Sequence, residues 1–323
     1  MLRYPGRVSS PTDVRAPSGA PAASPPAAQG SAPRWGLGDV AIGFVAGEVL
    51  SVLAYLLAAS ITHPAAGGPV GMGAAFGQVV GHIATGSTPV YQAPMPLWLQ
   101  AVVQIPLWAC LLGVPIMATR TKGNGPVRDL GLRIRAMDVP VGVAIGAAAQ
   151  LVLVPLIYWP ILQFIGNQDV SAPARQLTDR ATDPFSIVML MLIVGVGAPV
   201  AEEVFFRGLT QQAALRRSGP WVALFGTAAF FALTHFEPLQ FPALFAFGVL
   251  LGAMVFVTRR LGTSICAHLA FNLVAASTLV WRISPPPWVL ALVGGAGLAA
   301  TGYLVVAWRS GTGSEKPHRM TAP

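Results

Sequence analysis

Apolar stretches of about 20 residues recur along almost the whole chain after residue 38. A helix of that length crosses the hydrocarbon core of a bilayer, and it suits this environment because it pairs its own backbone groups. Hydrophobic residues make up 54% of the 323 residues and charged residues only 10%, whereas an ordinary globular protein has roughly 25% charged residues. We therefore predict an all-α polytopic membrane protein.

The apolar pattern predicts about eight transmembrane helices. The expected spans are residues 38–60, 97–118, 139–165, 185–212, 221–236, 241–258, 263–281 and 287–308. Composition divides the chain into a disordered Pro- and Ala-rich tail at 1–37, N-terminal transmembrane helices at 38–166, a second membrane domain at 167–309, and a disordered tail at 310–323.

Basic residues predict the orientation and argue against a nucleic-acid partner. The chain has 20 Lys and Arg residues and a net charge of +8, but they form short clusters between apolar runs rather than one basic stripe. Alternating spans place nearly all of them on one side of the membrane and only Arg175, Arg180 and Arg282 on the other. The positive-inside rule then predicts two cytoplasmic termini, and we expect a bacterial plasma membrane protein.

Ionisable residues within the spans mark the candidate site, because inserting one charged group at the bilayer centre costs on the order of 2.5 to 3.5 kcal/mol. The fourth span contains Glu202-Glu203-Val-Phe-Phe-Arg207. Residues four apart share a helix face, so Glu203 and Arg207 can pair, whereas Glu202 points roughly 100° away. We predict that Glu202 does the chemistry and that the other two residues support it.

Histidines on two further spans extend this site. The fifth span contains Phe231 and His235, and the seventh contains His268 and Asn272, in each case four residues apart on one helix face. A lone buried histidine is more often a packing element than a catalyst. The recurrence of such groups on separate spans predicts one shared site on the fourth, fifth and seventh helices.

Three chemistries fit these residue types. A water held between Glu202 and His235 could be deprotonated and attack a peptide carbonyl, with His268 and Asn272 donating to the oxyanion. Alternatively, Glu202, His235 and His268 could bind zinc, whose fourth position holds an activated water. A proton relay in a transporter would use the same groups without a nucleophile. Catalysis by a nucleophilic side chain is disfavoured, since the chain has no G-x-S-x-G motif.

The helix before Glu202 is expected to be interrupted. Gly195, Gly197 and Pro199 lie within two turns before the acidic pair, and a proline removes one backbone hydrogen bond. Such a break would leave room for water or an extended substrate beside Glu202. Another acid, Glu48, lies within the first span, where we expect a hydrogen-bonded packing role.

The three motifs together resemble those of a known family. EEVFFR at 202–207, FALTH at 231–235 and HLAFN at 268–272 are similar to the E-E-x-x-x-R, F-x-x-x-H and H-x-x-x-N motifs of the CPBP family. That family comprises the CAAX prenyl endopeptidases of the Ras-converting type and bacterial Abi-like intramembrane proteases. The resemblance covers about residues 185–281, and every motif position is matched.

The resemblance implies residue roles within a catalytic domain at 167–309. The residues at the positions of Glu202 and His235 activate water in the family, and those at the positions of His268 and Asn272 stabilise the oxyanion. No cofactor is expected, although zinc fits the same residue types. The implied glutamate-dependent mechanism needs no metal.

The implied partners are the membrane lipid and a protein substrate that is membrane-embedded or lipidated, of the CAAX-like kind. Some relatives act as immunity or scaffold proteins. The alternative function is therefore a non-proteolytic membrane interaction, of the bacteriocin-immunity type, in which the same groups stabilise a polar core.

Overall fold

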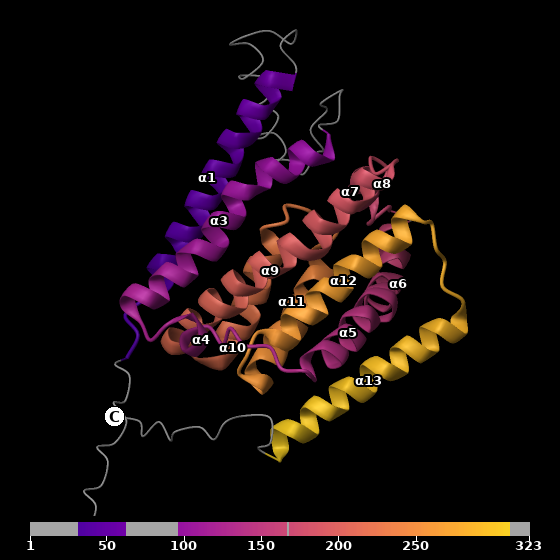
Figure 1. The fold of residues 1–323 in the computed structure, drawn as a ribbon. Coiled ribbons are helices and arrows are strands. Elements are labelled where there is room, and N and C mark those ends of the chain that lie inside the picture. Colours follow the sequence, from indigo (N-terminus) through magenta and orange to yellow (C-terminus); the bar gives the residue numbers. More distant parts are fainter. Residues whose placement is uncertain (1–31, 63–95, 167, 311–323) are drawn as a thin grey trace, which may run out of the picture. The chain divides into compact units, whose positions relative to one another are not determined.

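The computed structural model describes residues 32–62, 96–166 and 168–310 (Figure 1). The regular secondary structure of these residues is helical. The elements are α1 (Leu37–Thr62), α3 (Leu97–Lys122), α4 (Pro126–Asp129), α5 (Asp138–Ala148), η2 (Ala149–Leu153), α6 (Val154–Ile165), α7 (Ala172–Thr178), α8 (Pro184–Leu190), η3 (Met191–Gly197), α9 (Ala198–Glu202), η4 (Glu203–Thr210), α10 (Gln211–Leu233), α11 (Phe241–Thr258), α12 (Gly262–Val280) and α13 (Pro287–Arg309), where η denotes a π-helical segment. The predicted all-α polytopic membrane fold is confirmed.

The predicted tails lie largely outside the described residues. Nothing before residue 32 or after residue 310 is described, nor is the connection at 63–95. Within the described end of the first tail, Trp35 is buried, and its Nε1 atom donates to Asp129 Oδ2 at 2.8 Å. The Arg216 guanidinium lies 3.6 Å from the centroid of the Trp35 ring.

Seven helical stretches in the described residues are long and apolar enough to cross a membrane. One of them, Pro184–Leu233, has 50 residues, and a helix of that length would be about 75 Å long, more than twice the hydrocarbon thickness. It is divided at Gly219, whose φ of 82° and ψ of 175° are not helical. The rings of Phe206 and Phe230 lie 5.4 Å apart, so the chain turns back between them. The two parts correspond to the fourth and fifth predicted spans.

The helix leading to Glu202 is continuous but not regular. Segment η3 is π-helical. Helix α9 follows it directly, and Pro199 is the second residue of α9. The Ala198 N–H bonds to the carbonyl of Ile193, five residues back, instead of Val194. Because Pro199 has no N–H, the Val194 carbonyl receives neither the usual bond nor the π-type bond. The predicted interruption is therefore a change of helical winding.

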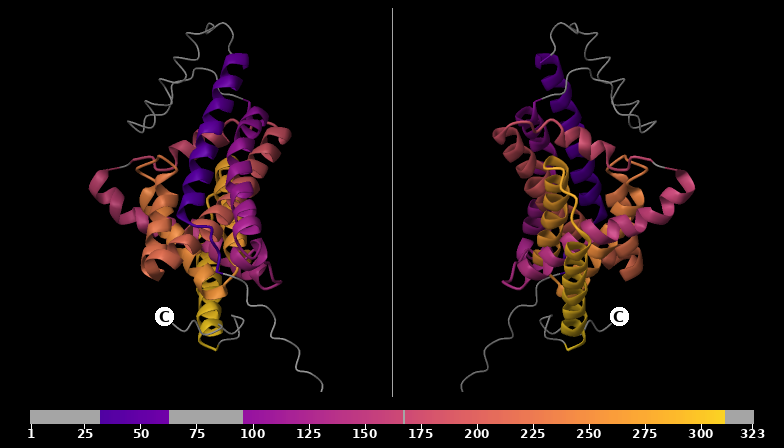
Figure 2. Two further views of the ribbon diagram at one scale, coloured as in Figure 1. Left: turned by 90° about the vertical axis from the view of Figure 1, so that its left-hand side faces the viewer. Right: turned by 90° about the vertical axis from the view of Figure 1, so that its right-hand side faces the viewer.

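Close helix packing surrounds the segment that carries His268. Helix α12 packs along α5, α10 along α11, and α1 along α3, whereas α13 packs on α5 (Figures 1 and 2). Gly142 and Gly146 of α5 face the α12 backbone so closely that a Cβ atom at Gly146 would collide with the carbonyl of Ala267. Small residues let two membrane helices approach to backbone contact. A larger side chain at Gly146 would displace α12.

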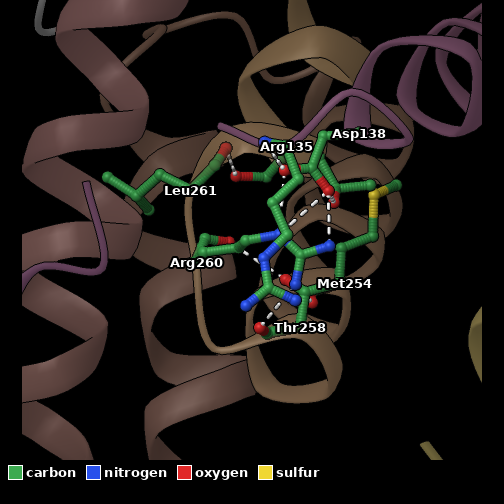
Figure 3. Close-up of polar contacts among 8 residues, drawn as sticks. Arg135, Asp138, Met254, Thr258, Arg260 and Leu261 are labelled. Atoms are coloured by element: carbon green, nitrogen blue, oxygen red, sulfur yellow. Dashed lines mark hydrogen bonds and ion pairs between the residues drawn. The ribbon is translucent and has the colours of Figure 1, made fainter. Parts of the chain in front are cut away.

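A polar lock fixes the start of α12 (Figure 3). The carboxylate of Asp138, at the start of α5, accepts from Arg260 Nη2 at 2.7 Å and from the hydroxyl of Thr263 at 2.7 Å. The N–H groups of Leu261 and Gly262 donate to the carbonyls of Gly131 and Arg133, in the loop before α5, at 2.8 and 3.0 Å. Because Asp138 is 1% exposed, this carboxylate depends on its protein partners rather than on water.

Loss of the lock should destabilise the fold. In Asp138→Ala, Arg260 and Thr263 lose a buried acceptor, and we expect the free energy of unfolding to fall by about 3 to 5 kcal/mol. The measurement is the unfolding midpoint in detergent. The matched control is Asp169→Ala, which breaks the pair with Arg175 whose side chains are 50% and 44% exposed and should change the midpoint little. Equal effects in the two variants would contradict the assignment.

Candidate active site

One cavity of about 460 Å³ brings together the four residues predicted to be chemical groups. Glu202, His235, His268 and Asn272 all line it, although they come from α9, the turn after α10, and α12.

A buried ion pair lies next to the cavity. Glu203 and Arg207 are both 0% exposed, and Oε1 of Glu203 lies 2.9 Å from Nη1 of Arg207. The spacing of four residues places the two side chains on one face, as the sequence predicts. Two buried charges are tolerated only when each compensates the other. Glu203 is thus held as an ionised acceptor behind the cavity wall.

Arg207 is fixed by contacts on two further elements. Its Nη2 atom donates to the carbonyl of Gly248 in α11 at 3.3 Å. Its guanidinium lies 4.4 Å from the centroid of the Phe231 ring, in the range of a cation–π interaction. Phe231 also makes edge contacts with both His235 and His268, at centroid distances of 4.9 and 5.7 Å. The Phe231 ring thus contacts the Arg207 guanidinium and both imidazoles.

His268 connects the ion pair to the cavity. Its Nδ1 atom lies 3.0 Å from Oε1 of Glu203, and because an ionised carboxylate only accepts, Nδ1 carries the proton of this bond. Its Nε2 atom lies 3.6 Å from Oε2 of Glu202. The imidazole is 3% exposed and therefore has little freedom to rotate. Glu203 sets the direction in which Nε2 points.

Glu202 faces a different environment from its neighbour. Its side chain is 21% exposed, against 0% for Glu203, and it lines the cavity. The nearest ionisable partner is the Nε2 atom of His268, at a distance longer than a hydrogen bond. A carboxylate that is accessible and not held by a direct bond can accept a proton from a bound water.

His235 and Glu202 both line the cavity. No direct hydrogen bond or ion pair joins them in the described residues, and the water that the sequence suggested between them stays a prediction. Instead, Nδ1 of His235 lies 2.9 Å from the carbonyl of Phe231, so that this nitrogen donates and Nε2 is the other available atom. The imidazole that contacts Glu202 directly in the described residues is that of His268.

Asn272 supports the backbone and still faces the cavity. Its Nδ2 atom donates to the carbonyl of Val194 at 2.8 Å. That carbonyl is the one that η3 and Pro199 leave without a helical donor. An amide nitrogen carries two N–H groups, so one remains for another acceptor. The sequence offers no signal for this contact, because the free carbonyl results from the altered winding of the helix.

Glu202, His235 and His268 are the residues that the sequence offers as possible zinc ligands. Among residues 32–62, 96–166 and 168–310, no group of three or more His, Cys, Asp or Glu side chains could hold a metal ion. Zinc binding by Glu202, His235 and His268 stays a prediction.

The structure adds neutral polar residues to the cavity wall. Gln100 and Gln104 of α3, Gln150 of η2 and Tyr158 of α6 also line it. Gln100 and Gln104 are four apart within an apolar span, a pattern that the sequence contains but that carries no charge to attract attention. Their helices lie in the N-terminal part of the chain, for which sequence reasoning gave no role in the site.

Comparison with known proteins supports the predicted resemblance. Residues 184–274 match the family described as Rce1-like, type II CAAX prenyl endopeptidase. No curated protein and no solved structure gives a significant match. The matched segment, together with the all-α membrane fold, supports the class of CAAX-type intramembrane proteases. Residues 184–274 are thus similar to the Rce1-like proteins of the CPBP family.

The buried pair should be coupled in stability. Glu203→Gln and Arg207→Gln each leave one uncompensated buried charge, and we expect each to lower the free energy of unfolding by about 3 to 5 kcal/mol. The double variant should lose clearly less than the sum of the two single losses. Denaturant unfolding in detergent measures the three values. Additive losses would show that the two side chains do not interact.

Proposed function

We propose that the protein hydrolyses a peptide bond of a membrane-associated protein within this cavity, with Glu202 as the general base. The position of Glu202 carries the proposal. Among the described residues that line the cavity it is the one carboxylic acid, and it lies beside the fixed imidazole of His268. The Rce1-like match over residues 184–274 supports the class of reaction.

In the proposed reaction, the carboxylate of Glu202 takes a proton from a water in the cavity. The water oxygen bonds to the carbon of the scissile carbonyl, and the carbonyl oxygen becomes an oxyanion. The carbon–nitrogen bond then breaks as Glu202 returns the proton to the leaving amine. The carboxylate is regenerated, and no covalent enzyme intermediate forms. A positioned base of this kind contributes about 10²- to 10⁴-fold to a reaction rate.

His268 and Asn272 supply the donors for the oxyanion. Since Nδ1 of His268 donates to Glu203, donation from Nε2 requires the doubly protonated imidazolium. Asn272 contributes the N–H that Val194 does not use. Donors that are fixed before the reaction stabilise a developing negative charge without reorganisation. The bonds to Glu203 and Val194 provide that fixation.

His235 is proposed to orient the substrate or the water rather than to remove the first proton. Its Nδ1 atom is hydrogen-bonded to the carbonyl of Phe231, so Nε2 is the ring nitrogen that can bind a substrate group or a water. The cavity wall is otherwise mostly apolar, with aromatic residues such as Phe247 and Phe271. Such a lining suits a membrane-embedded or lipidated protein segment of the CAAX-like kind.

The exchange Glu202→Gln should abolish proteolysis without unfolding the protein. We expect cleavage of a farnesylated Cys-a-a-X peptide by purified enzyme to fall at least about 100-fold, with an unchanged unfolding midpoint. The matched control is Glu48→Gln, which replaces another acid in a membrane helix that does not line the cavity. This control should retain full activity. If Glu202→Gln lowers the midpoint and leaves cleavage intact, the residue has only a structural role.

Metal removal should leave activity unchanged. After treatment with a strong chelator and desalting, we expect the cleavage rate of the same peptide to match that of untreated protein, because the proposed reaction uses a carboxylate as the base. Elemental analysis of the two samples shows whether zinc was present and removed. A loss of activity that added zinc restores would favour the zinc alternative.

A further inference from the structure

The cavity continues well beyond the proposed catalytic residues. On α12 it is lined from His268 through Asn272 and Ala275 to Leu279, a distance of about 16 Å along the helix at 1.5 Å per residue. An extended peptide advances about 3.3 Å per residue. This wall can therefore accompany about five residues of extended chain.

Three glutamines of the cavity lining, Gln100 and Gln104 on α3 and Gln150 on η2, share one feature. Their side-chain amides have no hydrogen-bond partner among the residues that the structure describes. The fully buried Gln211, by contrast, donates from Nε2 to the carbonyl of Gly252 at 3.0 Å. A primary amide offers two N–H donors and one carbonyl acceptor. In a membrane segment, leaving it unused costs free energy.

A substrate for peptide hydrolysis has the complementary need. Its scissile carbonyl is accessible only when the segment leaves the helical state, and each backbone N–H and C=O freed within the membrane then requires a new partner. Glutamine amides can pair with both groups. They do so without introducing a charge, which would be costly at this depth.

The charge of the lining restricts the segment further. Glu202 is the one acid among the described lining residues, and these include no Lys or Arg. Arg207 is buried in its pair with Glu203 and is not part of the lining. An acidic side chain in the bound segment would therefore meet a carboxylate and no compensating cation.

We infer that Gln100, Gln104 and Gln150 form a subsite for the main chain of an extended substrate segment that carries no acidic side chain. This inference rests on the proposed function and names the feature of the substrate that the cavity recognises. Recognition is through backbone amides, whereas side-chain identity matters less as long as the segment is not acidic and fits beside Ala275 and Ala276.

The test separates binding from hydrolysis. The probe is a dansylated, farnesylated Cys-Val-Val-Leu peptide, made with normal amides and with an ester replacing the amide that follows the scissile bond. Binding is titrated by fluorescence to detergent-solubilised Glu202→Gln protein, alone and combined with Q100M, Q104M or Q150M. The matched control is Q163M, at an exposed glutamine of α6 that does not line the cavity.

We expect each of the three cavity substitutions to weaken binding about fivefold, the effect of one net hydrogen bond, and Q163M to leave it unchanged. The ester should weaken binding to the Glu202→Gln parent by a similar factor. One of the three glutamine variants lacks the side-chain amide that pairs with the replaced peptide group. In that variant, the ester and the amide peptide should bind with nearly equal affinity. The unfolding midpoints should not fall, because the substitutions remove no hydrogen bond within the protein.

The outcomes distinguish the two proposals. For hydrolysis, the three glutamine substitutions are made in protein that retains Glu202. If the protein without substitutions cleaves the peptide and the three glutamine variants cleave it with the same KM, the subsite is removed and the protease function stands. Glutamine-dependent binding with no hydrolysis would remove the protease function and leave the subsite standing. Absence of probe binding to the Glu202→Gln parent, or equal effects of Q163M and the cavity substitutions, would overturn the subsite.

Discussion

The structure of the site depends on how the buried charge of Glu203 is compensated. Arg207 neutralises it from the same helix, and His268 donates to the same oxygen from α12. A single carboxylate thereby joins two segments that are far apart in the chain. Neither contact is optional in a low-dielectric interior, because an isolated charge there is strongly unfavourable. The direction of the imidazole toward Glu202 follows from this requirement.

Sequence patterns predicted the fold well, because long apolar runs have few alternatives in a bilayer. The pairing of Glu203 with Arg207 was also predictable, since both residues lie on one regular helical face. The relation between Glu202 and His268 was not. It depends on how α9 and α12 approach each other, which local spacing does not encode. The water that the sequence suggests between Glu202 and His235 stays a prediction.

The N-terminal helices contribute more than their sequence suggested. Helix α3 provides Gln100 and Gln104 to the cavity, and its Trp108 packs where a side chain at Gly197 would stand. Helix α5 holds α12 through backbone contacts and the Asp138 lock. Neutral amides and glycines escape notice in an apolar sequence, because neither has a partner at a fixed spacing. Their roles emerge only from the packing of distant segments.

The proline before Glu202 has an effect on the polarity of the cavity. Without an N–H at Pro199, the Val194 carbonyl is left for Asn272, and the Asn272 amide is anchored through its nitrogen. An amide held in that way cannot exchange its oxygen and nitrogen positions by rotation without losing the bond. One imino acid in α9 thus decides which end of a side chain on another helix is tethered. The winding of this helix therefore determines that the nitrogen of the Asn272 amide, and not its oxygen, is held.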